Sequence, residues 1–228
     1  MPPATVGEAI AAVLPYAVGM GLSPIPIITV VLVLFSTRAR INGPMFLAGW
    51  AAGLAGLVTA VYLTTSELEV GTDGTADDGI AWLRVLLGAV LLIAAARKWW
   101  RRPGPWEEPS LPAWMMRIEG ISPVRALGLG LLLASNPKNL ALSFGAGTSL
   151  AQLEVPTRQA GAAIVVFALV GSAAVIAAVG YASSGVAGAR QRLEQAKAWL
   201  ALHNGALLAA LYVVFGALLV SRGLGSVT

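Results

Sequence analysis

The stretch Ser135-Asn136-Pro137-Lys138-Asn139 lies in the middle of an otherwise apolar segment of the chain. A second polar and proline-rich stretch, Ser23-Pro24-Ile25-Pro26, lies equally deep in the first apolar segment. Because proline cannot donate the helical N–H and clashes with the preceding turn, each stretch predicts an interrupted helix. A membrane interior tolerates interrupted backbone only where it is buried in protein or lines a cavity. Two interruptions, one of them carrying a lysine, are typical of a transport site.

The composition indicates an integral membrane protein. The chain is 57% hydrophobic and 11% charged, with a mean hydropathy of +0.77, far from the balance of a soluble domain. Its formal net charge of +4 therefore concerns membrane orientation and anionic lipid, and we expect no nucleic acid as a partner. With no cysteine and the single histidine His203, we also expect no metal site, no cofactor and no enzymatic activity.

The apolar segments predict one transmembrane domain over residues 1–228 with six helices, since a spanning helix needs about 20 apolar residues. The predicted helices cover residues 8–35, 44–65, 80–97, 123–152, 159–182 and 204–221. Repeat one would span residues 8–97 and repeat two residues 123–221, with a basic and aromatic connector at 98–122 and an interfacial amphipathic helix at 186–202. Three helices per half make the two repeats inverted relative to each other. A match of residues 83–89 to 211–217 agrees with such a repeat.

The distribution of basic residues predicts the orientation. With both termini outside the bacterial inner membrane, eleven of the fifteen basic residues lie on the cytoplasmic side, as the positive-inside rule requires. The acidic loop predicted at residues 66–79 then lies outside. Arg84 would lie at an outer helix end, which leaves Lys138 as the only basic residue within the membrane.

Lys138 is the sharpest candidate for function. It lies about 20 Å into its predicted helix, too deep for its side chain to reach either membrane surface easily. Lysine, unlike arginine, can also lose its proton when it is desolvated. Three roles stay open: the side chain binds an anionic substrate, carries a proton, or pairs with backbone carbonyls at the interruptions and only holds the helices together.

The residues around the two interruptions have similarly open roles. Asn136 and Asn139 could bind substrate or cap the half-helices, and Ser23 has the same two roles. New half-helices are expected to begin near Ile27 and Leu140, with free N–H groups pointing into the site. Together with Lys138, these groups would attract an anion. No Asp or Glu lies inside any predicted span, which argues against cation export.

Small residues in the second predicted helix indicate close helix packing. Gly49, Gly53 and Gly56 are spaced so that another helix can approach closely. A sliding transport element would need the same smooth face.

These motifs together resemble one family. The stretches that carry the likeness are Ser23-Pro24-Ile25-Pro26, Arg38-Ala39-Arg40, Gly49-Trp50 and Asn136-Pro137-Lys138-Asn139. They resemble the mycobacterial glycopeptidolipid-addressing and sulfolipid-1-addressing proteins, the GAP family of the lysine-exporter (LysE) superfamily. The resemblance implies a six-helix inner-membrane exporter associated with delivering complex glycolipids to the cell envelope, with Pro24, Pro26, Pro137 and Lys138 in its transport core. The superfamily's cysteine-based electron-carrying branch is excluded, because the chain has no cysteine.

We therefore expect a secondary transporter that exports an anionic or glycosylated lipid, or a similar amphiphile, by alternating access. One alternative is an exporter of a small soluble solute such as an amino acid. Another is a non-transporting membrane scaffold for a lipid-export machinery. The expected partners are the substrate and membrane lipids, with a second copy or a lipid-export machinery as protein partners.

Overall fold

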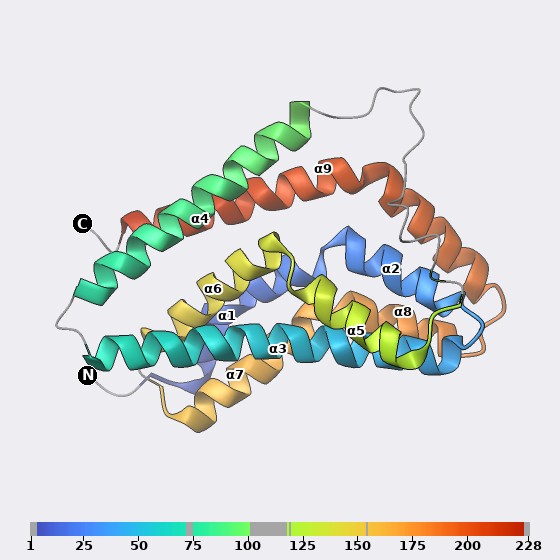
Figure 1. The fold of residues 1–228 in the computed structure, drawn as a ribbon, viewed down its shortest axis with the longest axis horizontal. Coiled ribbons are helices and arrows are strands. Elements are labelled where there is room, and N and C mark those ends of the chain that lie inside the picture. The colour runs from blue at the N-terminus through green and yellow to red at the C-terminus, as the bar shows by residue number, and fades with distance from the viewer. Residues whose placement is uncertain (1–3, 72–74, 101–117, 119, 154, 226–228) are drawn as a thin grey trace.

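The computed structural model describes residues 4–71, 75–100, 118, 120–153 and 155–225, and this part of the chain is helical without any strand (Figure 1). The all-α prediction is therefore confirmed. The helices are α1 (Val6–Gly21), α2 (Pro24–Leu34), α3 (Ala39–Gly71), α4 (Thr75–Trp100), α5 (Pro123–Ala134), α6 (Pro137–Ala151), α7 (Thr157–Gly171), α8 (Ala173–Ser183) and α9 (Ala189–Leu224).

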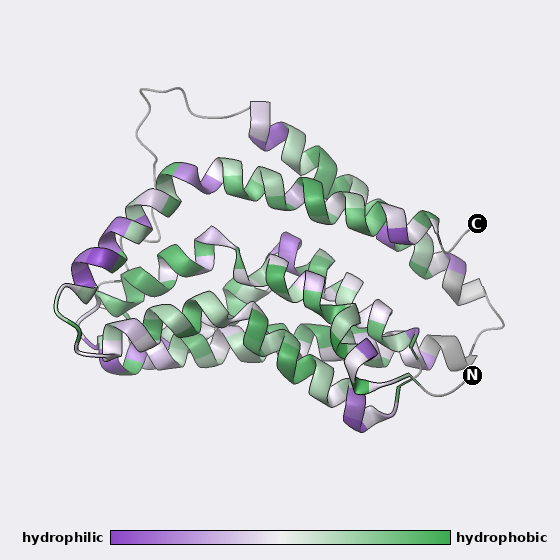
Figure 2. Cartoon of the chain, turned by 180° about the vertical axis from the view of Figure 1, so that it is seen from behind, coloured by the Kyte–Doolittle hydropathy of each residue, from purple (hydrophilic) through white to green (hydrophobic). Residues whose placement is uncertain are grey.

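The described helices include three that are long and apolar enough to cross a membrane alone: α3, α4 and α9. The pairs α1–α2 and α7–α8 are each bent by 56°, and the number of spans rises to five when each pair counts as one. The chain is thus a membrane-embedded protein. Hydrophobic residues cover the middle of the molecule and hydrophilic ones gather toward its ends, except at the start of α6 (Figure 2).

Several predicted boundaries are wrong. The predicted helix at 159–182 is divided at Ser172 into α7 and α8, although no proline marks the division. The predicted loop at 66–79 is largely helical, since α3 continues to Gly71 and α4 begins at Thr75. The predicted helices at 186–202 and 204–221 are one helix, α9. Gly205 lies where the two predicted helices meet, and a glycine inside a helix costs only about 1 kcal/mol, so the helix continues through it. In the connector predicted at 98–122, residues 98–100 belong to α4, and residues 101–117 and 119 lie outside the described residues.

The helices form two layers. The antiparallel helices α4 and α9 lie side by side and make the most extensive contact between elements, and the remaining helices pack beneath them (Figure 1). In that second layer α6 is the most enclosed helix, with α1 and α3 packed against it, while α5 packs on α3 and α7 on α1. The start of α1 and the end of α9 lie at the same end of the molecule.

Glycines set the closest helix contacts. At Gly49 the carbonyl oxygen of Leu127 in α5 occupies the place of a Cβ, and at Gly53 the side chain of Ala134 approaches in the same way. Gly130 faces them from α5, against the backbone of Trp50. Gly56 takes no part in this contact, because it is exposed and has no atom within 4 Å of a Cβ position. Helix α3 therefore packs on α5 through two of the three predicted glycines.

Candidate functional site

The α5–α6 interruption is a capped helix start. Helix α5 ends at Ala134, and Asn136 is the N-cap of α6 with Pro137 as its first residue. The side-chain oxygen of Asn136 accepts the backbone N–H of Asn139 at 3.1 Å, and its amide nitrogen donates to the carbonyl of Leu133 at 2.7 Å. Proline suits the first helical position, where its missing N–H would have no partner anyway. Helix α6 therefore begins at Pro137 rather than near Leu140.

The α1–α2 interruption has the same backbone plan without the side-chain cap. Helix α1 ends at Gly21, Ser23 is the N-cap of α2, and Pro24 is its first residue, so α2 also begins three residues before the predicted Ile27. Ser23 is buried and makes no capping hydrogen bond. Because Pro26 occupies the third helical position, the N–H that such a cap often binds is missing there.

Neither half-helix offers the full set of free N–H groups that the sequence led us to expect. Pro24 and Pro26 remove two of the first four N–H groups of α2. In α6, Pro137 lacks an N–H, and the N–H groups of Asn139 and Leu140 both bond to Asn136. The positive charge of the site therefore comes mainly from the Lys138 side chain.

Lys138 joins the two interruptions. Its side chain is buried, with 3% of its surface exposed, and Nζ donates a hydrogen bond of 2.9 Å to the backbone carbonyl of Gly19. Gly19 lies in the last turn of α1, where carbonyls have no partner within the helix, and a cation at a helix C-terminus is favourable. This bond is the pairing of Lys138 with a backbone carbonyl, which is one of the three possible roles predicted from the sequence. It is the only hydrogen bond of the Lys138 side chain within the described residues.

Two polar groups on α6, close to Lys138 in the sequence, have no hydrogen-bond partner among the described residues. Asn139 Oδ1 and Ser143 Oγ are buried, and the two residues lie one helical turn apart on one face of α6. The Oγ of Ser172, at the α7–α8 junction, is buried in the same unpaired state. Leaving such a group without a hydrogen bond costs about 1–3 kcal/mol. Buried polar groups of this kind are typical of a site that binds a polar ligand. Sequence reasoning missed both serines, although Ser143 follows Asn139 by four residues.

The α7–α8 junction lies against the end of α1. A Cβ at Gly21 would lie 2.9 Å from the carbonyl oxygen of Val170, and Trp50 Nε1 of α3 donates to the carbonyl of Gly171 at 3.3 Å. Since Lys138 also bonds to the last turn of α1, the end of α1 contacts both Lys138 of α6 and the α7–α8 junction. The site is therefore built from the ends of half-helices in both halves of the chain.

A second polar cluster surrounds the C-terminal end of α6 and corrects the placement of Arg84. The sequence predicts this residue at an outer helix end, but it lies within α4 and is 2% exposed, so Lys138 is not the only buried basic residue. Arg84 donates to Thr148 Oγ1 at 3.1 Å and to Gln152 Oε1 at 2.9 Å. Arg222 of α9 donates to Ser149 Oγ at 2.9 Å and to the hydroxyl of Tyr16 at 3.1 Å. These bonds, which we call the arginine cluster, tie α4 and α9 to the end of α6, and α1 to α9.

At the opposite end of the molecule, α9 contacts the end of α2. The guanidinium of Arg190 lies 4.8 Å and the Nζ of Lys197 5.6 Å from the centre of the Phe35 ring. Lys197 also forms an ion pair with Glu194 at 2.8 Å. Contacts of a cation with an aromatic face contribute about 0.5–1 kcal/mol at exposed sites. Helix α9 is thus attached near both of its ends.

The chemistry of the central site is that of anion binding. A lysine side chain beside amide and hydroxyl groups can hold a sulfate, phosphate or carboxylate oxygen through charge-assisted hydrogen bonds. Among the described residues no group of three or more His, Cys, Asp or Glu side chains could hold a metal ion.

Fold and site together define an all-helical membrane protein with a buried basic site at interrupted helices. Residues 13–225 match the family described as "Sap, sulfolipid-1-addressing protein". Because the match covers most of the chain, from within α1 to the end of α9, the chain belongs to this family, which confirms the suspected GAP-family membership. No curated protein and no solved structure matches the chain. Membership of the wider lysine-exporter superfamily stays a prediction.

Proposed function

We propose that this protein is a secondary transporter that moves an anionic or glycosylated lipid, or a similar amphiphile, across or out of the bacterial inner membrane by alternating access. The observation that carries the proposal is the buried Lys138, whose amine is held by one backbone carbonyl where two interrupted helices meet. The family description names sulfolipid-1, which fits an anionic lipid as the substrate.

The hydrogen bond to Gly19 is one that an acidic head group can replace. A carbonyl oxygen carries only a partial charge, whereas a sulfate or phosphate carries a full one, so the ammonium group of Lys138 is attracted more strongly to the acidic group. This difference in attraction grows in a medium of low dielectric constant. The ammonium form of Lys138 has two further N–H groups for the same ligand. The unpaired Asn139 Oδ1 and Ser143 Oγ would accept hydrogen bonds from sugar hydroxyls of the head group. Lys138 would then exchange a carbonyl partner for the substrate.

Six membrane crossings in two inverted halves are part of the proposal, with α5–α6 as the sixth span. Along the chain the segments α1–α2, α3, α4, α5–α6, α7–α8 and α9 alternate in direction (Figure 1). The contact of α3 with α5 has its counterpart in that of α1 with α7, as inverted halves require. Gly88 and Gly216 face each other, with each Cβ position within 3 Å of the other's carbonyl oxygen. Those two glycines are also aligned by the match of residues 83–89 to 211–217.

Two sets of contacts would open in turn during transport. The arginine cluster holds α4 and α9 to α6 at the end of the molecule where the chain begins, which we assign to the outer side. The contacts of Arg190 and Lys197 with Phe35 hold α9 to α2 at the cytoplasmic end. Both termini then lie outside, and the basic residues at the start of α3 lie in the cytoplasm, in agreement with the positive-inside rule.

The test is movement of sulfatide, a sulfated glycolipid, across vesicles of phosphatidylcholine that contain the purified chain. An added arylsulfatase reports sulfatide that reaches the outer leaflet. We expect movement by the wild type and a loss of about tenfold or more in Lys138→Met, since hydrogen bonds to charged groups contribute about 1.5–3 kcal/mol. Lys138→Arg keeps the charge but not the shape of the amine, and we expect an intermediate rate.

The outcomes separate the competing functions. Unchanged sulfatide movement in a folded Lys138→Met variant would contradict the assignment of the site. Movement of an amino acid but not of sulfatide would indicate an exporter of small solutes. No movement of either, together with stable capture of a lipid-export protein, would indicate a scaffold.

A further inference from the structure

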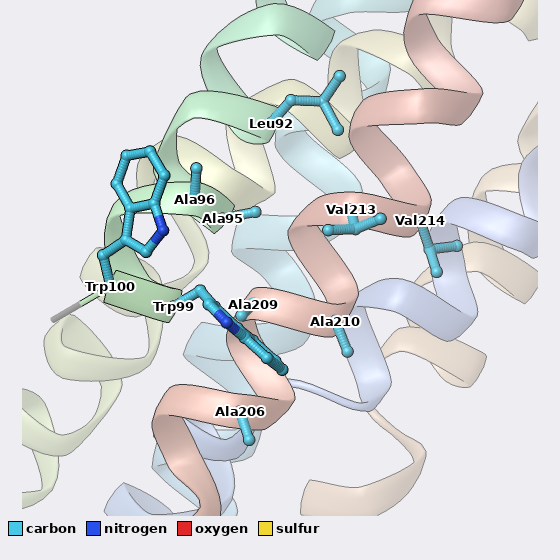
Figure 3. Close-up of a pocket in the computed structure, with 10 residues that line it drawn as sticks. All are labelled: Leu92, Ala95, Ala96, Trp99, Trp100, Ala206, Ala209, Ala210, Val213 and Val214. Atoms are coloured by element: carbon cyan, nitrogen blue, oxygen red, sulfur yellow. The ribbon is translucent and has the colours of Figure 1, made fainter. Parts of the chain in front are cut away.

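We infer that the lipid-facing side of α9 carries a track for the hydrocarbon chain of the transported lipid; the inference rests on the proposed function and adds the place of the lipid tail. The track consists of two apolar grooves. The first, of about 540 Å³, lies between α4 and α9 (Figure 3). Trp99 and Trp100 lie on its α4 side, and small residues form much of its wall: Ala95, Ala96, Ala206, Ala209 and Ala210.

The second groove, of about 650 Å³, lies between α1 and α9. Pro15 and Val18 of α1 line one side, and Leu218 and Ser221 of α9 line the other. Ser221 is the one lining residue with a polar side chain. Val214 of α9 lines both grooves, so the two meet at that residue and follow α9 in succession.

The track passes within one side chain of the Lys138 site. Phe215, which follows Val214, is buried and lines the second groove. Its ring occupies the space where a Cβ of Gly19 would be, and the carbonyl of Gly19 is the partner of Lys138. A lipid could therefore keep its tail in the track on one side of Phe215 while its head group reaches Lys138 on the other.

The cytoplasmic end of the track suits the arrival of an anionic lipid. Arg97 and Lys98 lie in the last turn of α4, next to Trp99. Tryptophan is enriched where a membrane meets water, and basic residues there attract acidic head groups by about 1 kcal/mol each. A hydrocarbon chain is the occupant that fits an almost entirely apolar recess separated from an anion site by one side chain.

The test uses the absence of cysteine from the native sequence. Ala210→Cys in the first groove and Leu218→Cys in the second are each labelled with a benzophenone, in phosphatidylcholine vesicles that contain a minor fraction of sulfatide. The matched control is Leu86→Cys, an exposed position on α4 that lines neither groove. After illumination, mass spectrometry measures how much sulfatide and phosphatidylcholine is attached at each position.

We expect sulfatide to exceed its mole fraction among the adducts at positions 210 and 218 and to match it at position 86. Adducts that follow the bulk composition at all three positions, or a crosslink to a second copy of the chain, would overturn the inference.

As a second arm, Ala210→Trp fills the groove and should slow sulfatide movement about tenfold, or about 1.4 kcal/mol, while Leu86→Trp has no effect. Equal rates in the two tryptophan variants would also overturn it. Enrichment without any movement in the wild type would instead refute the proposed transport and leave the track standing.

Discussion

The two proline interruptions share a backbone plan and differ in chemistry. Each begins a half-helix with a polar N-cap followed by proline, Ser23-Pro24 in one and Asn136-Pro137 in the other. The first supplies only a hydrogen-bond acceptor to the site, the carbonyl of Gly19, whereas the second supplies the donor Lys138. The two halves can thus have distinct roles in one site, because both halves have the same backbone arrangement at the interruption but carry different side chains there.

The largest effect on stability is expected at Gly19, on the acceptor side. In Gly19→Ala the new methyl group would overlap the Phe215 ring, and overpacking of this kind costs about 1–3 kcal/mol. The control is Leu132→Ala, in the last turn of α5, where the side chain is exposed and the change should stay within about 0.5 kcal/mol. Thermal unfolding in detergent measures both. Equal melting temperatures for the two variants would show that Phe215 does not pack tightly over Gly19.

A smaller effect is expected at the N-caps. Asn136→Ala removes the acceptor of the Asn139 N–H and should cost about 1 kcal/mol. Ser23→Ala removes no capping bond, so it should cost less stability than Asn136→Ala. The difference in unfolding free energy between the two variants tests whether only one interruption is capped by its side chain. A larger loss for Ser23→Ala would reverse the comparison.

The membrane class, the two proline interruptions, the family and the lysine at the centre of the site could all be predicted from the sequence. It misplaced the starts of the half-helices by three residues, because proline was taken as an interior break although it also favours the first helical position. It missed the α7–α8 division at Ser172, where the sequence has no proline to signal it. These are local errors, with identifiable local causes.

The remaining differences come from contacts between residues far apart in the sequence. Arg84 is buried because Thr148 and Gln152, 64 and 68 residues further along the chain, accept its hydrogen bonds. The Phe215 ring lies over Gly19 because α9 packs beside α1. A single sequence shows neither contact, since the spacing within one helix says nothing about which distant helix lies next to it.

The central claim is that an acidic head group replaces Gly19 as the partner of Lys138. Gly19-Met20 is the only Gly-Met pair in the sequence, so isotopic labelling of glycine carbonyl carbons and methionine amide nitrogens isolates the Gly19 carbonyl signal by NMR. We predict that sulfatide shifts this signal toward the value that Lys138→Met shows without sulfatide, because both changes remove the hydrogen bond from Nζ. A signal that Lys138→Met shifts and sulfatide leaves unchanged would contradict the account and leave Lys138 as a structural link between α1 and α6.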